Sequence, residues 1–463
     1  MLRFSAGDFL AKILHFLTFI YLARVLDVAA YGVLEFANSS MTYFLLLADC
    51  GLELWATREA AQGKDVKELV SRIVPLRLLL AVVAFSLMLG LLPVFPNFAF
   101  LRTVLILFGL TLFTQALNLK WVFFGREKIR SVVAGLILAQ IAFAIAVFAF
   151  IRSPAALVYV PILRLAADFV MVAYFSRLFW VEFGGKVGYT LKNSRLVFKA
   201  ALTMGAAHGL ATVNYNFDSV LIGFMLNSIA VGLYNAAYRP VTMAVALPVS
   251  YFLGLLPLLS RIYVESQDTF RATIVRSLRW TATLAMPIGI GGTFLAYPII
   301  DFLFGPAYAE AAPALQVLCW SAVLVILRGT YRQAFNATGN QRLDLRCATA
   351  STTSNLCLNL LLIPRYGILG AAVATLAAEI LWLTTAATYF YRRINRINLL
   401  SFLFRPAIAA VAMGIYFFLV PHGFWMIRAL LGVLIYFGIL LLLGQAELRE
   451  LFSVKTFAKR KDS

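Results

Sequence analysis

The feature that most constrains this chain is a series of long apolar stretches separated by short polar breaks. Stretches of about 18 to 25 apolar residues are long enough to cross the hydrocarbon core of a bilayer as helices. Hydrophobic residues make up 62% of the 463 positions. We therefore predict an all-α integral membrane protein with about 14 transmembrane helices. The predicted spans are 5–26, 31–54, 73–95, 101–122, 131–151, 155–177, 198–226, 229–258, 279–304, 311–336, 345–363, 367–391, 400–420 and 424–444.

The formal net charge of +19 is distributed as a membrane topology requires, which argues against nucleic-acid binding. With these spans, about 30 of the 40 Lys and Arg residues lie in or beside one set of alternating loops, and about five lie in the opposite set. Loops rich in Lys and Arg stay on the cytoplasmic side of the membrane. We expect a multi-pass protein of the bacterial cytoplasmic (inner) membrane, with both termini cytoplasmic and no nucleic-acid partner.

The two halves of the chain resemble each other in sequence. "YGVLEFA" at 31–37 matches "VGLYNAA" at 231–237, and "GLELWATR" at 51–58 matches "GLLPLLSR" at 254–261. The matches keep their order and each half holds six predicted spans, which indicates a parallel repeat. Matched positions are Gly32 with Gly232, the cytoplasmic-end arginines Arg58 and Arg261, "FFGREK" (123–128) with "ATGNQR" (337–342), and Asp168 with Glu379.

This repeat defines the expected domains. We predict an N-lobe with helices 1–6 at 1–178, a cytoplasmic linker at 179–197 and a C-lobe with helices 7–12 at 198–392. Helices 13 and 14 and a basic cytoplasmic tail follow at 393–463. The loops are too short for a soluble domain, so the function is expected to lie within the bilayer or at its surfaces.

Ionisable side chains inside the predicted spans are the candidate functional residues. On insertion scales a central Arg, Lys or Asp costs about 2.5 to 3.5 kcal/mol, so such groups need partners or water. Two oppositely charged pairs at i, i+4 spacing are interpreted as structural ion pairs. They are Asp8 with Lys12, and Arg164 with Asp168, whereas Asp49 lies near a cytoplasmic end and is expected to reach the interface.

Three arginines have no acid within a helical turn. Arg328 and Arg332 are same-face cations four residues apart, so they need an outside anion or an acid from another helix. Arg239 lies in "NAAYRPVTMA" (235–244), where Pro240 weakens the helix. Asp218 on the adjacent span is expected at a similar depth, and a structural Asp218–Arg239 bridge is one interpretation.

The functional interpretation is a water-accessible, anion-attracting cavity. Its predicted lining cations are Lys12, Arg239, Arg328 and Arg332, since a guanidinium binds phosphate oxygens two at a time. The rings of Tyr215, Tyr234 and Tyr238 either stack on sugar faces or serve only in packing. The predicted substrate-binding set is Lys12, Asp218, Tyr238, Arg239, Arg328 and Arg332.

Motifs of several enzyme classes are missing from the sequence. It holds no G-x-x-x-x-G-K-[ST] phosphate loop, no H-E-x-x-H metal motif and no G-x-S-x-G nucleophile elbow. We therefore expect no enzymatic activity, no metal and no cofactor.

Four segments carry a resemblance to a known family. They are "LARVLDVAAYGVLEFA" (22–37), "FFGREK" (123–128), "NFDSVLIGFMLNSIAVGLYNAAYRPV" (216–241) and "NATGNQRLDL" (336–345). Over nearly its whole length the chain resembles the multidrug/oligosaccharidyl-lipid/polysaccharide exporter superfamily, and within it the Wzx-type polysaccharide flippases. The resemblance implies two six-helix lobes around a central cavity that opens alternately to either face, with helices 13 and 14 appended.

The resemblance also implies a substrate, an oligosaccharide on a polyprenyl pyrophosphate that moves from the cytoplasmic to the outer leaflet during surface polysaccharide biosynthesis. Membrane lipids, a polysaccharide polymerase and glycosyltransferases are the implied partners. Related lipid II flippases carry an essential cation on the first helix, and Lys12 in "LAKILHF" takes that place, with lysine instead of arginine.

Three alternatives remain open at this point. One is a cation-coupled multidrug antiporter of the same fold, another is a lipid II flippase, and the third is a non-transporting membrane scaffold. Drug antiporter sites favour acidic and aromatic cavities, whereas the buried charges without an acid nearby in this sequence are mainly basic.

Overall fold

The computed structural model describes residues 2–184, 187–192, 194–246, 248–394 and 400–444, and within these ranges it does not describe the side chains of 2–6, 8, 206–215, 250, 393 and 400–401. The described chain forms two compact units, Met1–Ala236 and Ala237–Ser463. The predicted lobe boundaries and the linker at 179–197 stay predictions. Helix α10 (Ser194–Met225), expected to open the C-lobe, is grouped with the first unit.

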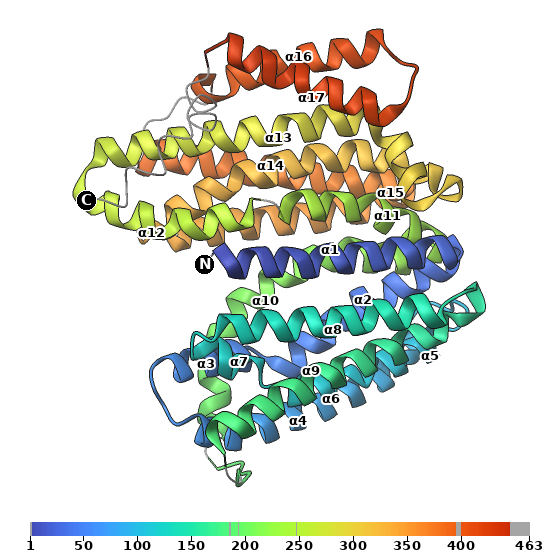
Figure 1. Cartoon of the computed structure of the whole chain (residues 1–463), viewed down its shortest axis with the longest axis vertical. Coiled ribbons are helices and arrows are strands. Elements are labelled where there is room, and N and C mark those ends of the chain that lie inside the picture. The colour runs from blue at the N-terminus through green and yellow to red at the C-terminus, as the bar shows by residue number, and fades with distance from the viewer. Residues whose placement is uncertain (1, 185–186, 193, 247, 395–399, 445–463) are drawn as a thin grey trace. The chain divides into compact units, whose positions relative to one another are not determined.

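The first unit consists of helices and the loops between them, with no strand among its described residues (Figure 1). Its fourth predicted span is broken into three short helices, with one break at Leu110 and another at Asn118, where the backbone is extended. Besides α10, the unit contains α1 (Leu2–Val25), α2 (Val28–Asp49), α3 (Leu52–Ala61), α4 (Val66–Leu91), η1 (Leu92–Val94), α5 (Leu101–Gly109), α6 (Thr111–Leu117), α7 (Lys120–Gly125), α8 (Ile129–Phe150), η2 (Pro154–Val158), α9 (Tyr159–Phe183) and the start of α11 (Ser228–Ala246).

The second unit also consists of helices and the loops between them in its described part, and it contains the longest helices described. The helix α15 (Gln341–Arg393) is two helices that meet at a kink at Gly367, where φ is 58°. A positive φ of this kind favours glycine, because a Cβ atom would clash there. The other elements are α12 (Val249–Glu265), α13 (Gln267–Phe304), η3 (Pro306–Ala311), α14 (Ala312–Ala337), α16 (Leu400–Leu419) and α17 (Trp425–Leu442).

Many of these helices have the length and composition of membrane spans. Among the described residues, nine helices are long and apolar enough to cross a bilayer, or ten if α11 and the bent α12 count as one span. The bend between α11 and α12 is 42°, and Pro248 lies at this break. The predicted all-α membrane class is confirmed, and the expected 14 spans are consistent with this series.

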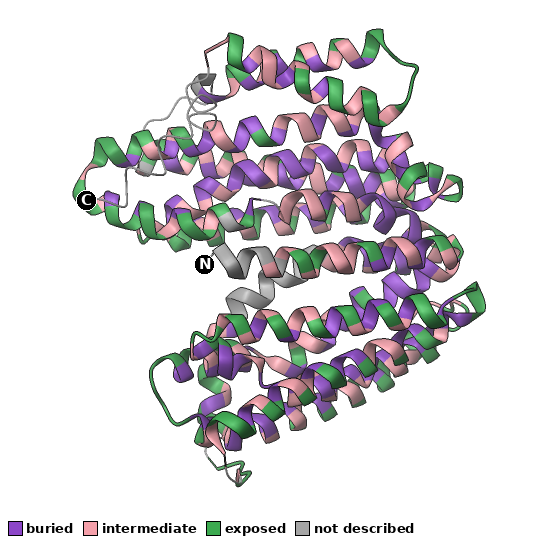
Figure 2. Ribbon diagram, in the orientation of Figure 1, coloured by how far each residue is buried: buried purple, intermediate pink, exposed green. Residues whose placement is uncertain are grey.

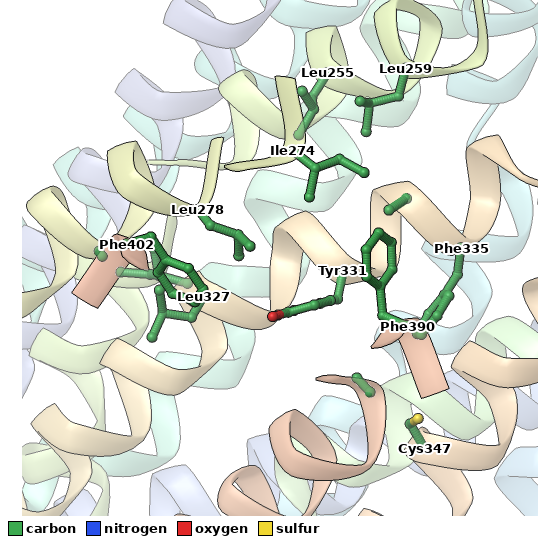
Figure 3. Close-up of a cluster of buried hydrophobic side chains, with 14 of the residues drawn as sticks. Leu255, Leu259, Ile274, Leu278, Leu327, Tyr331, Phe335, Cys347, Phe390 and Phe402 are labelled. Carbon is green, nitrogen blue, oxygen red and sulfur yellow. The ribbon is translucent and has the colours of Figure 1, made fainter. Parts of the chain in front are cut away.

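Each unit has its own apolar core. In the first, the stacked rings of Phe123 and Phe175 lie 5.5 Å apart at their centroids, next to the buried Trp121. In the second, Figure 3 shows Leu278, Leu327, Tyr331, Phe335 and Phe390 pointing into one cluster from α13, α14 and α15. These clusters hold the helices that carry the charged residues in fixed positions.

The hairpin of α16 and α17 packs along α13 (Figure 1). Tyr436 on α17 donates a hydrogen bond from its hydroxyl to the carbonyl oxygen of Thr283, at 3.0 Å. Both helices expose much of their surface, whereas α14 is largely buried (Figure 2). Exposed apolar side chains on two long helices are what a lipid-facing surface requires.

Two glycines that the repeat aligns contact each other inside the first unit. A Cβ atom added at Gly32 on α2 would lie 1.7 Å from the carbonyl oxygen of Ser228, and one at Gly232 on α11 would lie 2.4 Å from that of Val28. Val28 and Ser228 each precede their glycine by four residues, so the crossing is close to symmetric. Only glycine permits the two backbones to approach this closely.

The helices that cross at these glycines also begin alike. Asp27 Oδ1 accepts a hydrogen bond from the amide of Ala30 at 2.7 Å, and Asn227 Oδ1 accepts one from the amide of Ala230 at 2.9 Å. Such side chains satisfy amides at the start of a helix that have no partner within it. The sequence repeat therefore extends to the way in which α2 and α11 start.

Candidate functional site

The charged residues of the second unit lie between α14 and α15. Arg328 Nη1 on α14 lies 2.9 Å from Glu379 Oε2 on α15, and both side chains are buried. One turn further along α14, Arg332 Nε lies 3.3 Å from Asp344 Oδ1 at the start of α15. Of the two partners that the sequence left open for these arginines, the structure shows acids from another helix.

A tryptophan lies against both arginines. The ring centroid of Trp382 on α15 is 5.4 Å from Arg328 Cζ and 5.8 Å from Arg332 Cζ. Distances below about 6 Å are in the range of cation–π attraction. Two guanidinium groups, two carboxylates and one indole thus form the Arg328–Arg332 cluster, which we define as these two arginines with Asp344, Glu379 and Trp382.

The sequence indicated only one of the two acidic partners. The sequence repeat matches Glu379 with Asp168, whereas no pattern in the sequence indicates Asp344. It lies in "NATGNQRLDL" at the start of the eleventh span, where an acid can be taken for an interfacial residue. Only the packing of α15 on α14 brings its carboxylate to Arg332.

The cluster differs in exposure from one end to the other. The side chains of Arg328 and Glu379 are 9% and 8% exposed, whereas those of Arg332 and Asp344 are 36% and 22% exposed. A guanidinium has five N–H donors, so a carboxylate on one edge leaves others for a second acceptor. Arg332 is therefore the more accessible of the two guanidinium groups.

The first unit holds the repeat counterpart of the Glu379 contact. Asp168 Oδ1 on α9 lies 3.3 Å from Arg164 Nε, and Asp168 Oδ2 accepts a hydrogen bond from Gln115 Nε2 on α6 at 3.4 Å. Asp168 is buried, while about a third of the Arg164 side chain is exposed. The pair predicted from i, i+4 spacing is thus also linked to a second helix.

Asp168 and Glu379 reach the same span of their respective halves. The match of 123–128 with 337–342 places Gln115 opposite Gly329, one residue from Arg328. Each acid therefore contacts the fourth span of its own half. The partner is a neutral amide in the first unit and a cation in the second.

Asp218 on α10 is buried and accepts a hydrogen bond from the Tyr234 hydroxyl on α11 at 2.7 Å. Next to it, Ser219 Oγ donates to Asn235 Oδ1 at 3.2 Å. The Tyr234 side chain is fully buried, so it serves in packing and is not accessible for stacking on a sugar. These contacts join α10 to the beginning of α11 within the first unit.

Tyr238 and Arg239 lie further along α11 and are half-buried. They belong to the second unit, whereas Asp218 belongs to the first. The Asp218–Arg239 bridge therefore stays a prediction. The side chain of Tyr215 lies outside the described residues.

Lys12 on α1 is exposed, and the side chain of its predicted partner Asp8 lies outside the described residues.

The two repeat-related arginines, Arg58 and Arg261, are also exposed, but they make different contacts. Arg58 Nη1 lies 3.8 Å from the sulfur of Met204, whereas Arg261 Nε lies 3.6 Å from Glu265 Oε1 on its own helix. The structure does not bring Arg58 or Arg261 into the Arg328–Arg332 cluster.

Sequence reasoning missed a buried ionic group in the first unit. Arg77 on α4 is buried, and its Nη2 lies 3.3 Å from Asp49 Oδ1 and 3.7 Å from Glu53 Oε2. Lys120 Nζ lies 2.8 Å from Glu53 Oε1. Asp49 also accepts hydrogen bonds from the amides of Gly51 and Glu53, so it is held in place and does not simply extend into the interface.

Position in the sequence explains part of what was missed. Arg77 is the fifth residue of the predicted span 73–95, where a charge can be taken for an interfacial one. Glu35 is a second omission at the same depth, because it is the fifth residue of the predicted span 31–54 and is buried on α2. An inventory of every ionisable residue in the spans would have found both.

Comparison with family models places this chain among known proteins. The model described as "Polysaccharide biosynthesis protein" matches residues 3–263. The match includes the first unit and the first residues of the second.

Individual relatives are named as a flippase and as an O-antigen transporter. "Probable flippase AglR" of Haloferax volcanii is 27% identical over 219 residues, which is 46% of this chain and 46% of that protein. The "Putative O-antigen transporter" of Escherichia coli K12 is 23% identical over 83% of this chain and 94% of that protein. This chain thus spans about half the length of AglR and nearly the whole of the E. coli relative.

Solved structures share the fold at low identity. "Lipid II flippase MurJ, inward closed conformation" superposes with a TM-score of 0.80 at 15% identity, over 98% of this chain and 100% of that chain. An inward-facing multidrug resistance MATE family transporter of the MOP superfamily gives a TM-score of 0.68 at 13% identity, over 82% and 95%. At such identities the likeness shows the fold alone.

Proposed function

Because the chain belongs to the polysaccharide biosynthesis protein family, we propose that it flips a polyprenyl-pyrophosphate-linked oligosaccharide from the cytoplasmic to the outer leaflet by alternating access. Relatives named as an O-antigen transporter and a flippase support a role in surface polysaccharide biosynthesis. The fold shared with MurJ and MATE proteins is compatible with alternating access. The proposed activity moves a lipid without making or breaking a covalent bond, so it requires no catalytic residue.

The observation that carries this proposal is the pair of arginines on one face of α14. Arg328 is paired with Glu379, and Arg332 is paired with Asp344. This pairing lowers the cost of keeping two cations within a membrane protein. A pyrophosphate carries more charge than a carboxylate and can be bound by two N–H groups at once, so it competes for the same donors.

We assign the first encounter with the pyrophosphate to Arg332 and tighter binding to Arg328. Arg332 is the more exposed, and Asp344 can turn toward water when it is displaced, because it too is partly exposed. Glu379 is buried and cannot do so without a rearrangement of α15 against α14. Displacement of Glu379 would therefore couple headgroup binding to a helix movement.

We propose that the remaining predicted residues make additional contacts with the substrate. Lys12 and Arg239 supply further cations, Tyr238 a ring for a sugar face, and Asp218 a hydrogen-bond acceptor within the lining. We place both termini on the cytoplasmic side of a bacterial inner membrane. Glycosyltransferases would supply the substrate on that side, and a polysaccharide polymerase would use the product on the other.

A reconstituted flipping assay tests the proposal. The purified full chain is placed in proteoliposomes with a fluorescent polyprenyl-pyrophosphate oligosaccharide, and the outward movement of the lipid is followed by a membrane-impermeant quencher. We expect Arg332→Gln to lower the initial rate at low lipid concentration by about 10-fold, because charge-assisted hydrogen bonds to the headgroup are lost.

Arg271→Gln is the matched control. Arg271 is exposed near the start of α13, outside the predicted span, and the variant removes the same charge. Equal rates for wild type and Arg332→Gln would contradict the assignment of Arg332. Absence of flipping together with uptake of organic cations would overturn the proposed function in favour of a drug antiporter, and no transport of either would favour a scaffold.

A further inference from the structure

Trp382 occupies a special position in the Arg328–Arg332 cluster. Its side chain is fully buried, and it follows Glu379 by three residues, so both side chains lie on the same face of α15. Its Nε1 has no hydrogen-bond partner among the described residues. The indole therefore acts on its surroundings through its ring face and its volume, not through its polar atom.

The guanidinium groups of both neighbouring arginines lie over that ring. Arg328 and Arg332 have the same charge and lie one turn apart on α14, so they repel each other. The ring centroid lies 5.4 Å from one guanidinium carbon and 5.8 Å from the other. The negative electrostatic potential of an aromatic face attracts each cation and opposes their separation.

The three groups that hold the arginines respond differently to an incoming anion. Glu379 and Asp344 bind through the N–H edges of the guanidinium groups, and their negative charge is repelled by a pyrophosphate. An uncharged ring is not repelled in this way. Because a guanidinium can stack with its face while its edge donates hydrogen bonds, the indole contact and phosphate binding are compatible.

We infer that Trp382 is a positioning residue for the pyrophosphate headgroup: it holds Arg328 and Arg332 side by side when the substrate replaces their carboxylate partners. This inference rests on the proposed function, and it adds a determinant of headgroup affinity that does not itself contact the headgroup. It makes the indole the fixed part of the cluster and the two carboxylates the exchangeable part.

Two substitutions separate the ring from the volume that it fills. Trp382→Phe keeps an aromatic face, whereas Trp382→Leu keeps only an apolar side chain. We expect Trp382→Leu to weaken binding of inorganic pyrophosphate to the purified full chain by about 10-fold, the sum of two cation–π contacts. Trp382→Phe should bind within about threefold of wild type, since a phenyl face retains part of the attraction. Isothermal titration calorimetry in detergent measures both.

Trp121 provides the matched control for lost packing. It is a buried tryptophan in the core of the first unit, its Nε1 also lacks a hydrogen-bond partner, and no arginine of the described chain is found over its ring. We expect Trp121→Leu to lower the thermal unfolding temperature as Trp382→Leu does, but to leave pyrophosphate affinity unchanged.

Each outcome decides something. Wild-type affinity in Trp382→Leu, or an equal loss of affinity in Trp121→Leu, would overturn the role of Trp382 and leave the proposed function in place. Equal losses in Trp382→Phe and Trp382→Leu would show that size rather than the aromatic face matters, and would also overturn it. If the wild-type chain binds no pyrophosphate, the proposed headgroup site fails and this inference fails with it.

Discussion

Arg328 and Glu379 form a buried ion pair across α14 and α15, with 2.9 Å between Nη1 and Oε2. Each charge offsets much of the free-energy cost of burying the other, because burial removes most of the water that would solvate either one. The pair therefore makes the stability of the second unit depend on both residues together.

Replacing one partner should cost more than replacing both. We expect Arg328→Gln to destabilise the protein by about 3 to 5 kcal/mol, because it leaves the Glu379 carboxylate buried without its cation. The double variant Arg328→Gln, Glu379→Gln should recover much of that loss, since two amides can bond to each other. Thermal unfolding in detergent measures the difference, and equal unfolding temperatures for single and double variants would show that the pair is not coupled.

In the first unit, loss of the cation next to Asp168 should destabilise the protein less than loss of the cation next to Glu379. Arg164→Gln should lower the unfolding temperature less than Arg328→Gln does, because Arg164 is about one third exposed and Asp168 keeps its hydrogen bond from Gln115. Adding Gln115→Leu to Arg164→Gln should then produce a larger drop than the two single effects added, because Asp168 loses both partners. Strict additivity of the two substitutions would contradict a shared role.

The glycine crossing of α2 and α11 should not tolerate a side chain. In Gly32→Ala and Gly232→Ala, the added Cβ atom would overlap backbone atoms of the other helix. We expect each substitution to destabilise the protein by about 1 to 3 kcal/mol, the usual cost of overpacking. Gly254→Ala on α12 is the control, since a Cβ atom there meets nothing within 4 Å. It should be neutral or slightly stabilising, and similar behaviour of all three variants in unfolding experiments would argue against the close crossing.

The ionic group around Arg77 should behave as a structural bridge. Arg77→Gln removes the cation next to Asp49 and Glu53, so we expect a clear fall in unfolding temperature. Lys120→Gln should have a smaller effect, because the Lys120 and Glu53 side chains are about one third exposed and water replaces part of the lost interaction. The order of the two effects is the prediction, and the reverse order would contradict it.

Much of the fold could be predicted from the sequence, because spans and a parallel repeat depend on apolar length and order along the chain. The aligned Gly32 and Gly232 show how far this extends, since a one-dimensional match identified two positions that contact each other. The partners of Arg328 and Arg332 could not be predicted in the same way. Glu379 and Asp344 reach them only through the packing of α15 on α14, and a charge near a span end, such as Asp344 or Arg77, looks the same in sequence whether it meets water or protein.

The glycine crossing also bears on how the protein is made. Gly32 on α2 packs against Ser228 and Gly232, so this contact forms only after the first residues of α11 have been synthesised. A fragment that stops at the end of α9 would expose this face of α2 to lipid or to another chain. The predicted N-lobe is thus completed by the start of α11, the second helix of the predicted C-lobe, which favours synthesis and membrane insertion of both lobes as one polypeptide.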